Sequence, residues 1–204
     1  MMPFNVESYL NKIFYFTKKQ LGISLFTVDI EIKYVSKNEK SYAYNNYDDK
    51  IKIYHREKAI TKKKCDYDFF LVYALGHELA HIILGKSFGK ANLPPVAWDE
   101  IWAHFCSIDI FLPLFASQYI LHDFQFQYYS NEDKRILDQK RNVALWSTEW
   151  LLNEGRSILK NIYKKSDFKT TLNSFSLITN SELSSEDCYF KLFQYLNRLN
   201  DDII

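Results

Sequence analysis

The chain has 204 residues, of which 47% are hydrophobic and 17% aromatic, so it has ample apolar side chains for a sizeable core and is not a disordered chain. Lys and Arg total 26 against 25 Asp and Glu. A protein that neutralises nucleic-acid phosphates usually carries a marked basic excess, so this near-balance argues against direct nucleic-acid binding. We expect the one dense basic run, residues 62–64, to be a solvated loop.

The three cysteines are Cys65, Cys106 and Cys188. Their odd number and the lack of a short Cys-x-x-Cys spacing predict neither a disulfide framework nor a cysteine-zinc site, and we expect Cys106 to be a small buried hydrophobe. The first residues lack the basic and apolar runs of a signal peptide, and no stretch approaches the ~20 apolar residues needed to cross a bilayer. The sequence therefore predicts a cytoplasmic protein with no membrane partner.

The first third of the chain changes from helical to strand periodicity. Residues 5–21 place apolar side chains at helical spacing, with Asn5 as a candidate cap. Apolar and polar residues then alternate at 27–35, 42–44 and 51–54. Such alternation is typical of strands with one buried face, and we expect two or three antiparallel strands here.

The rest of the chain is mostly helical in pattern. One helix is expected from Asp66 to Leu84 with Gly85 as its stop, and a second from about residue 96 to Leu112, where Pro113 ends or bends it. Further helices are expected at 131–165, 168–178 and 182–199. With only five glycines and four prolines, the sequence predicts an α+β fold that is mainly α. We expect a core over residues 1–125 and a helical region over 126–204 packed on it as one unit.

The helix expected from Asp66 to Leu84 contains the pattern His-Glu-x-x-His at residues 77–81. Four residues are about one helical turn, so the imidazoles of His77 and His81 project from one face and are able to share a tetrahedral ion. Glu78 lies beside them, where its carboxylate reaches a water rather than the metal. Zinc lowers the pKa of a coordinated water toward ~7, and a neighbouring carboxylate then accepts its proton. The pattern indicates one Zn²⁺ per chain with Glu78 as the catalytic base.

A catalytic zinc needs a third protein ligand and an open position. No His-x-x-Gly-x-x-His continuation follows the motif, so this ligand must come from elsewhere in the chain. Glu100 lies 19 residues after His81 on the next expected helix, and Asp99 is its competitor.

At this point the sequence resembles the ImmA/IrrE family of bacterial zinc metallopeptidases. The family's second motif reads approximately Glu-x-x-Ala-Asn-x-Phe-Ala-x-x-Leu-Leu-x-Pro. Glu100, Ala103, Ile110, Phe111 and Pro113 match it in register without a gap. The resemblance covers about residues 66–115. It implies a zincin-like core made of an N-terminal helix, a small antiparallel sheet, the motif helix and a third-ligand helix, followed by a helical C-terminal extension. It also implies that Glu100 is the third ligand.

The chain departs from the family's pattern at several positions. His104 stands where the family has Asn, and Cys106-Ser107 replaces Phe-Ala. His104 lies one turn after Glu100, so it is a candidate to hydrogen-bond a metal ligand or to compete as a ligand itself. An oxyanion stabiliser is also needed. His122 is one candidate, and His55 and the tyrosines are others.

The tryptophans Trp98 and Trp102 flank Glu100 at helical spacing. Packing between helices is the simpler interpretation of both, and forming a wall of the site is the alternative.

Members of this family typically occur on phages and other mobile elements or in stress loci, and they cleave a helix-turn-helix transcriptional repressor. The resemblance therefore implies a zinc-dependent endopeptidase whose protein partner is such a repressor. The alternative is a zinc-containing protein-binding module that grips a repressor, toxin or antitoxin without cutting it. The intact Glu78 argues for the endopeptidase, because a structural zinc site has no need of that carboxylate.

Overall fold

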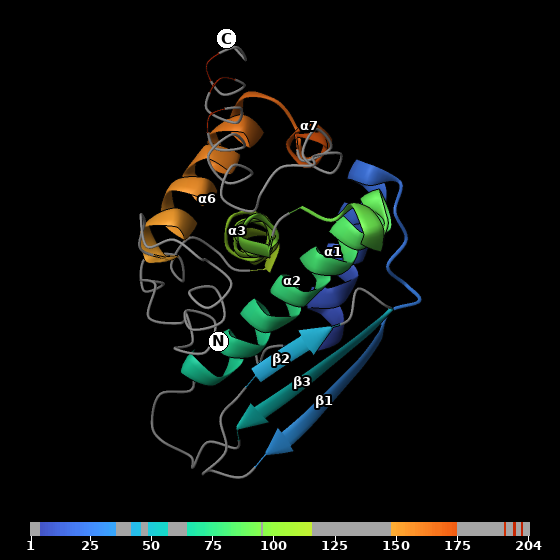
Figure 1. Cartoon of the computed structure of the whole chain (residues 1–204). Helices are drawn as coiled ribbons and strands as arrows, with labels where there is room; N and C mark the ends of the chain where they lie inside the picture. The colour runs from blue at the N-terminus through green and yellow to red at the C-terminus, as the bar shows by residue number, and fades with distance from the viewer. Residues whose placement is uncertain are drawn as a thin grey trace. The chain divides into compact units, whose positions relative to one another are not determined.

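The computed structural model describes residues 5–35, 42–45, 49–56, 65–94, 96–115 and 148–174, and residues 194, 198 and 201 (Figure 1). The chain divides into two compact units, Met1–Lys90 with Cys106–Phe115, and Ala91–Phe105 with Ala116–Ile204. Each unit is described separately below. The expected boundary at residue 125 lies outside the described residues.

The first helix is the one that the sequence predicts. α1 spans Val6–Leu21, and the side chain of Asn5 accepts a hydrogen bond from the backbone N–H of Ser8 at 2.9 Å. This bond satisfies one of the N–H groups that a helix leaves unpaired at its first turn. The helix ends at Gly22, whose φ of 73° is a left-handed conformation that glycine adopts without strain. Its buried face carries Tyr9, Ile13, Phe14 and Thr17.

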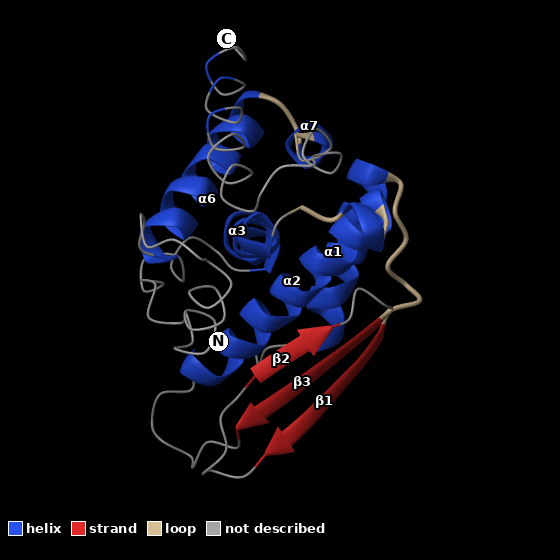
Figure 2. Cartoon of the chain, in the orientation of Figure 1, coloured by secondary structure: helices blue, strands red, loops and turns tan. Residues whose placement is uncertain are grey.

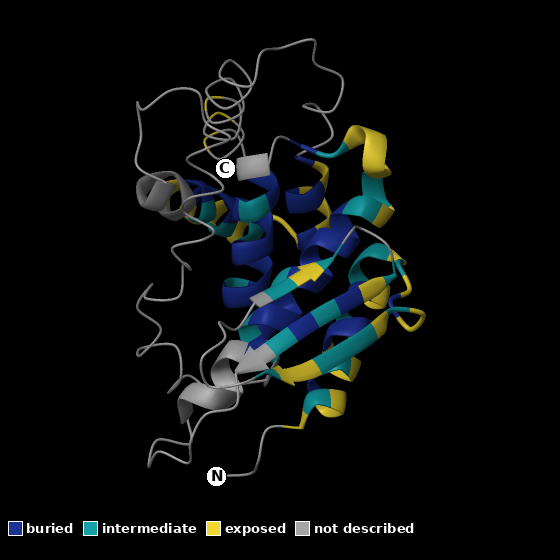
Figure 3. Ribbon diagram, turned by 60° about the horizontal axis from the view of Figure 1, so that its bottom comes forward, coloured by how far each residue is buried: buried dark blue, intermediate teal, exposed yellow. Residues whose placement is uncertain are grey.

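A three-stranded sheet follows, in the strand order β1-β3-β2 (Figure 2). The strands are β1 (Asp29–Val35), β2 (Tyr42–Asn45) and β3 (Lys50–Arg56). Burial alternates along the central strand, with Ile51 and Ile53 fully buried on the face that packs against helices (Figure 3). The expected antiparallel sheet is wrong in one pairing. β2 and β3 are antiparallel, but β1 and β3 are parallel. Alternation reports which face of a strand is buried and carries no information on which strand lies beside it.

The central helix of this unit is α2 (Cys65–Phe88), which packs against α1, β2 and β3. From Leu71 to Leu84 nearly every side chain of α2 is buried, as expected for a helix surrounded by protein on all sides. Gly85 does not stop it, contrary to the sequence prediction. The helix continues to Phe88, and Gly89, with a φ of 77°, terminates it by donating its N–H to the carbonyl of Gly85 at 2.8 Å. The left-handed φ of a glycine, and not the mere presence of a glycine, marks the end of a helix.

A helical segment runs without a break through α3 (Val96–Phe105), the π-helical η2 (Cys106–Phe111) and α4 (Leu112–Phe115). The sequence predicted that Pro113 would end or bend this helix near Leu112. The helical segment instead continues past Pro113 to Phe115, so it does not end at Leu112. The turn before the proline, η2, is π-helical, and irregular helical turns of this kind are found where a regular hydrogen-bond pattern is interrupted. A π-turn inserts an extra residue into a helix and is often found at functional sites.

The second unit contains α3, α6 (Thr148–Lys165) and α7 (Phe168–Asn173). Gly155 of α6 lies so close to Ile101 of α3 that an added Cβ would be 2.6 Å from the Ile101 Cδ1 atom. Trp102 stacks on Phe168, with ring centroids 5.3 Å apart. α7 ends at Asn173, five residues before the predicted end. Of the helix predicted at 131–165, only the part from Thr148 falls on described residues, and most of the helix predicted at 182–199 falls outside them.

The described residues are therefore mainly helical with one small mixed sheet, which confirms the α+β, mainly α class. None of the helices described here is long and apolar enough to cross a membrane.

The C-terminal end of α2 is tied to the start of β3 by an ion pair. Lys86 lies 2.6 Å from one carboxylate oxygen of Asp49, and Thr27 donates a hydrogen bond to the other at 3.0 Å. The Lys86 ammonium, followed by the Thr27 hydroxyl, lowers the pKa of Asp49 below its usual value of 3.8. A carboxyl with a lowered pKa stabilises the fold above its unfolded pKa, and this contribution is lost as the pH falls through the lower, folded pKa.

We predict that Asp49→Asn lowers the free energy of unfolding at pH 7 by about 0.5 kcal/mol, a small effect because both groups are partly exposed to solvent. The difference from wild type should shrink and vanish as the pH is lowered below about 4. Urea unfolding of both proteins between pH 3 and pH 7 measures it. Lys86→Met should lower the free energy of unfolding by a similar amount. In the double variant with Asp49→Asn the further loss should be small. A difference that persists unchanged at pH 3 would contradict this account.

A second close contact joins α2 to η2 and α1. A Cβ added at Gly76 would lie 2.9 Å from the Tyr9 hydroxyl, 3.0 Å from Ser107 Oγ and 3.3 Å from Ser107 Cα. We predict that Gly76→Ala destabilises the protein by about 1–3 kcal/mol, because the added methyl group forces the two helices apart. Chemical denaturation measures this loss. In a Tyr9→Phe background the penalty should be smaller, since the nearest atom is gone. An unchanged penalty in that background would place the conflict at Ser107 alone.

Candidate metal centre

The His-Glu-x-x-His motif lies in the middle of α2, as predicted. Glu78 and His81 are buried, with 7% and 6% of their surface exposed, whereas His77 is half-buried. All three are polar side chains in a helix whose other positions are almost entirely apolar. Burying them is costly unless each has a partner. The hydrogen-bond partners of these side chains therefore bear on the function of the site.

The two histidines point their Nε2 atoms at each other. These atoms lie 3.1 Å apart and the ring centroids 4.8 Å apart. Two histidine nitrogens that bind one tetrahedral zinc at about 2.0–2.1 Å must lie about 3.3 Å from each other. The pair thus has nearly the separation that a shared ion requires, and the donor set of two imidazoles suits zinc. On this geometry the residues of α2 fit a zinc ion.

Glu78 is held by a residue from the sheet. The side-chain amide of Asn45, at the end of β2, donates to Glu78 Oε2 and also lies 3.3 Å from the backbone carbonyl of Glu78. The amide thus fixes one carboxylate oxygen and leaves the other for a different hydrogen bond. This contact links residues 33 positions apart, and it orients Glu78 relative to the helix that carries the histidines.

His77 also has a partner on its own helix. The hydroxyl of Tyr73, one turn earlier, lies 3.3 Å from His77 Nδ1, and the two rings are 5.5 Å apart. The carbonyl of Tyr73 accepts a hydrogen bond from the Ser107 hydroxyl at 2.8 Å. Tyr73 therefore connects the half-buried histidine to the first turn of η2.

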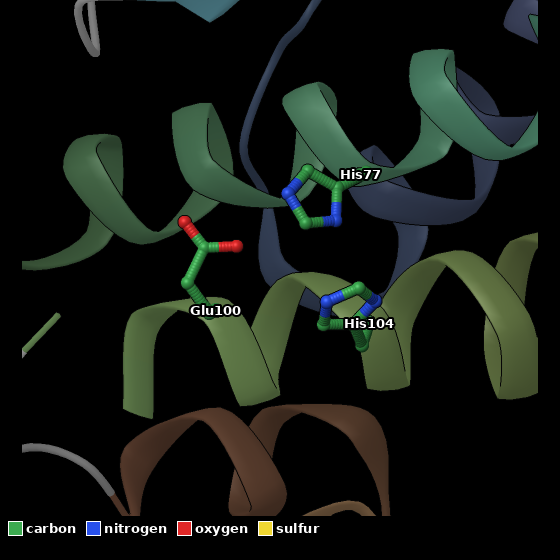
Figure 4. Close-up of side chains that lie close together, drawn as sticks. All are labelled: His77, Glu100 and His104. Atoms are coloured by element: carbon green, nitrogen blue, oxygen red, sulfur yellow. The ribbon is translucent and has the colours of Figure 1, made fainter. Parts of the chain in front are cut away.

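The other predicted site residues lie on α3. Glu100 is half-buried, and His104, one turn later, is 1% exposed. Their side chains extend from the same side of α3 (Figure 4). Asp99, the competing carboxylate, is buried with 3% of its surface exposed. Among the described residues, the one group of three donor side chains that could hold a metal ion is His77, Glu100 and His104. It contains His104 where the sequence prediction has His81.

The remaining sequence predictions have different outcomes. Trp98 and Trp102 are fully buried, and Trp102 stacks on Phe168, as expected for helix packing. Cys106 is a free, fully buried thiol, which confirms that prediction. Burial, and secondarily the Asp109 carboxylate, raises the pKa of the Cys106 thiol. His122 lies outside the described residues, so its predicted oxyanion role stays a prediction.

Sequence reasoning missed three residues that contact the motif helix: Asn45, Tyr73 and Ser107. Tyr73 was accessible in principle, because it precedes His77 by four residues on the same helical face. Asn45 directly follows the strand pattern at residues 42–44. Nothing in the local pattern links it to Glu78, since their contact depends on the packing of the sheet against α2.

Comparisons with protein-family models, with curated proteins and with solved structures find no match to this chain.

The state of Cys106 gives a direct test of the packing next to the site. Thiol alkylation requires the thiolate, and both burial and the raised pKa of Cys106 oppose its formation. We predict that a Cys65→Ser/Cys188→Ser variant resists iodoacetamide at pH 8 while folded and is alkylated rapidly in denaturant. Mass spectrometry measures the labelling. Equal labelling rates in the two states would mean that Cys106 is exposed.

Proposed function

We propose that the chain is a zinc-dependent endopeptidase in which His77, His81 and Glu100 hold one zinc ion and Glu78 is the catalytic base. The observation that carries this proposal is the approach of the two Nε2 atoms to 3.1 Å within one buried helix. Two imidazoles are brought together in a protein interior at a cost in desolvation, and a shared cation is the simplest compensation.

The case for Glu100 rests on the continuity of the helical segment from α3 into η2. In η2, Ser107 contacts α2 at Tyr73 and Gly76, just before His77. Counting back from Ser107, His104 comes one turn earlier and Glu100 two turns earlier on the same helical face. The donor group of His77, Glu100 and His104 also supports the proposal.

Zinc, when bound, would act as a Lewis acid that makes water acidic and polarises a peptide carbonyl. Glu78 would accept the proton of the attacking water with its carboxylate. It would then pass that proton to the nitrogen of the departing amine. The hydrogen bond from Asn45 keeps the carboxylate in one orientation during both transfers. Burial of Glu78 in turn keeps bulk water away from the proton that it carries.

The substrate class follows from the resemblance to the ImmA/IrrE family. We propose a zincin-like core and a narrow, cytoplasmic regulatory activity that clips a helix-turn-helix repressor of a mobile element or stress locus. The in-register match of the second motif around Glu100 supports this reading. So does the order of elements, in which a helix and a small sheet precede the motif helix.

A second candidate is a zinc-containing binding module that does not cut its partner. His104 favours it, because a buried imidazole in the donor group is able to act as a fourth protein ligand. Four protein ligands would close the position that a hydrolytic zinc must keep open. The test of the proposal must therefore distinguish His104 from His81.

We predict about one zinc per chain in the purified wild-type protein. His77→Ala, His81→Ala and Glu100→Ala should each lose most of it, because each removes one of three ligands. Glu78→Gln, the matched control, should keep its zinc. Elemental analysis after dialysis against metal-free buffer measures the content. His104→Asn, which introduces the family's residue, should also keep zinc.

Wild-type protein without zinc would overturn the proposal. Loss of zinc in His104→Asn as well as in the three ligand variants would favour the binding module, because four protein ligands would then hold the ion and close its open position.

A further inference from the structure

We infer that Tyr73 is a positioning residue for the metal site: its hydroxyl holds His77 in the orientation and tautomer that present Nε2 to the ion. This inference rests on the proposed zinc site and concerns a residue that neither the His-Glu-x-x-His motif nor the second motif contains. It starts from one contact, in which the Tyr73 hydroxyl lies 3.3 Å from His77 Nδ1.

The contact has chemical consequences because the two ring nitrogens of histidine are distinct. A metal bound at Nε2 requires a lone pair there, which leaves the proton of the neutral ring on Nδ1. That Nδ1–H needs an acceptor, and the phenolic oxygen of Tyr73 is within reach. A hydroxyl is both a donor and an acceptor. The same contact therefore accommodates His77 before and after the metal binds, and only the direction of the hydrogen bond changes.

The position of Tyr73 is itself fixed from the other side. Its backbone carbonyl accepts the hydrogen bond from Ser107, and its helix packs closely against Tyr9 and Ser107 at Gly76. The tilted ring of Tyr73, at 40° to the plane of His77, also limits rotation of the imidazole. A rigid partner of this kind reduces the ordering cost of metal binding, and such partners typically change metal affinity by 10–100-fold.

Tyr73→Phe tests the inference because it deletes the hydroxyl and keeps the ring. We expect zinc to bind about tenfold more weakly than to wild type, measured by competition with a chromophoric chelator. The urea midpoint of the metal-free variant should be close to that of wild type. Tyr15→Phe is the matched control, since Tyr15 of α1 is 66% exposed and the substitution deletes the same group away from the site. Its zinc affinity should be unchanged.

A second measurement separates positioning from general packing. In zinc-loaded, ¹⁵N-labelled wild type, the Nδ1–H proton of His77, assigned by its absence in His77→Ala, should exchange slowly with solvent. In Tyr73→Phe this proton should exchange faster. If wild type binds zinc and the variant matches it in affinity and proton exchange, Tyr73 does not position His77. A loss of affinity that comes only with a lowered urea midpoint, and with unchanged exchange, would also overturn the inference. If wild type itself binds no zinc, the proposed function fails instead.

Discussion

The close approach of α2 and η2 at Gly76 is the constraint on which the rest of the site depends. A Cβ added at Gly76 would lie 3.3 Å from Ser107 Cα, and the Ser107 hydroxyl reaches the carbonyl of Tyr73 at 2.8 Å. Both groups are partly or fully buried, so leaving either without a partner would cost about 1–3 kcal/mol. The contact thereby fixes the register of η2 against the motif helix.

The burial of α2 makes its polar cluster the main support for the proposed metal site. α2 is buried on nearly all sides, and apolar residues at 77, 78 and 81 would be the cheaper choice for packing alone. The chain instead keeps two histidines and a glutamate there and supplies partners from a strand, from the same helix and from each other. A buried polar network costs less than its isolated members only when its groups are matched. The matching here leaves the two Nε2 atoms 3.1 Å apart, the arrangement that the proposed zinc ion would complete.

Local periodicity predicted most of the elements but not their ends or their neighbours. α1 and its Asn5 cap follow from apolar spacing and a side-chain acceptor, both of which are short-range properties. The end of α2 does not follow from local properties. Gly85 and Gly89 are both candidate stops in the sequence, and only Gly89 adopts the left-handed conformation. The local sequence pattern also does not predict the parallel pairing of β1 with β3. It depends on β3 lying between β1 and β2, which is a property of the whole sheet.

The candidate site likewise combines residues that the local sequence predicts with residues that only tertiary packing brings together. His77, Glu78, His81 and in principle Tyr73 share one helix, so their spacing alone brings them to one region, and the motif could be interpreted without a structure. Asn45 and Ser107 reach that helix from 33 and 34 residues away, through the sheet and through η2. The spacing of the two histidines is thus encoded in the local sequence. The orientation of Glu78 is set by tertiary packing. In the proposed site, the presence or absence of His104 among the ligands would decide between a closed, structural zinc and an open, hydrolytic one.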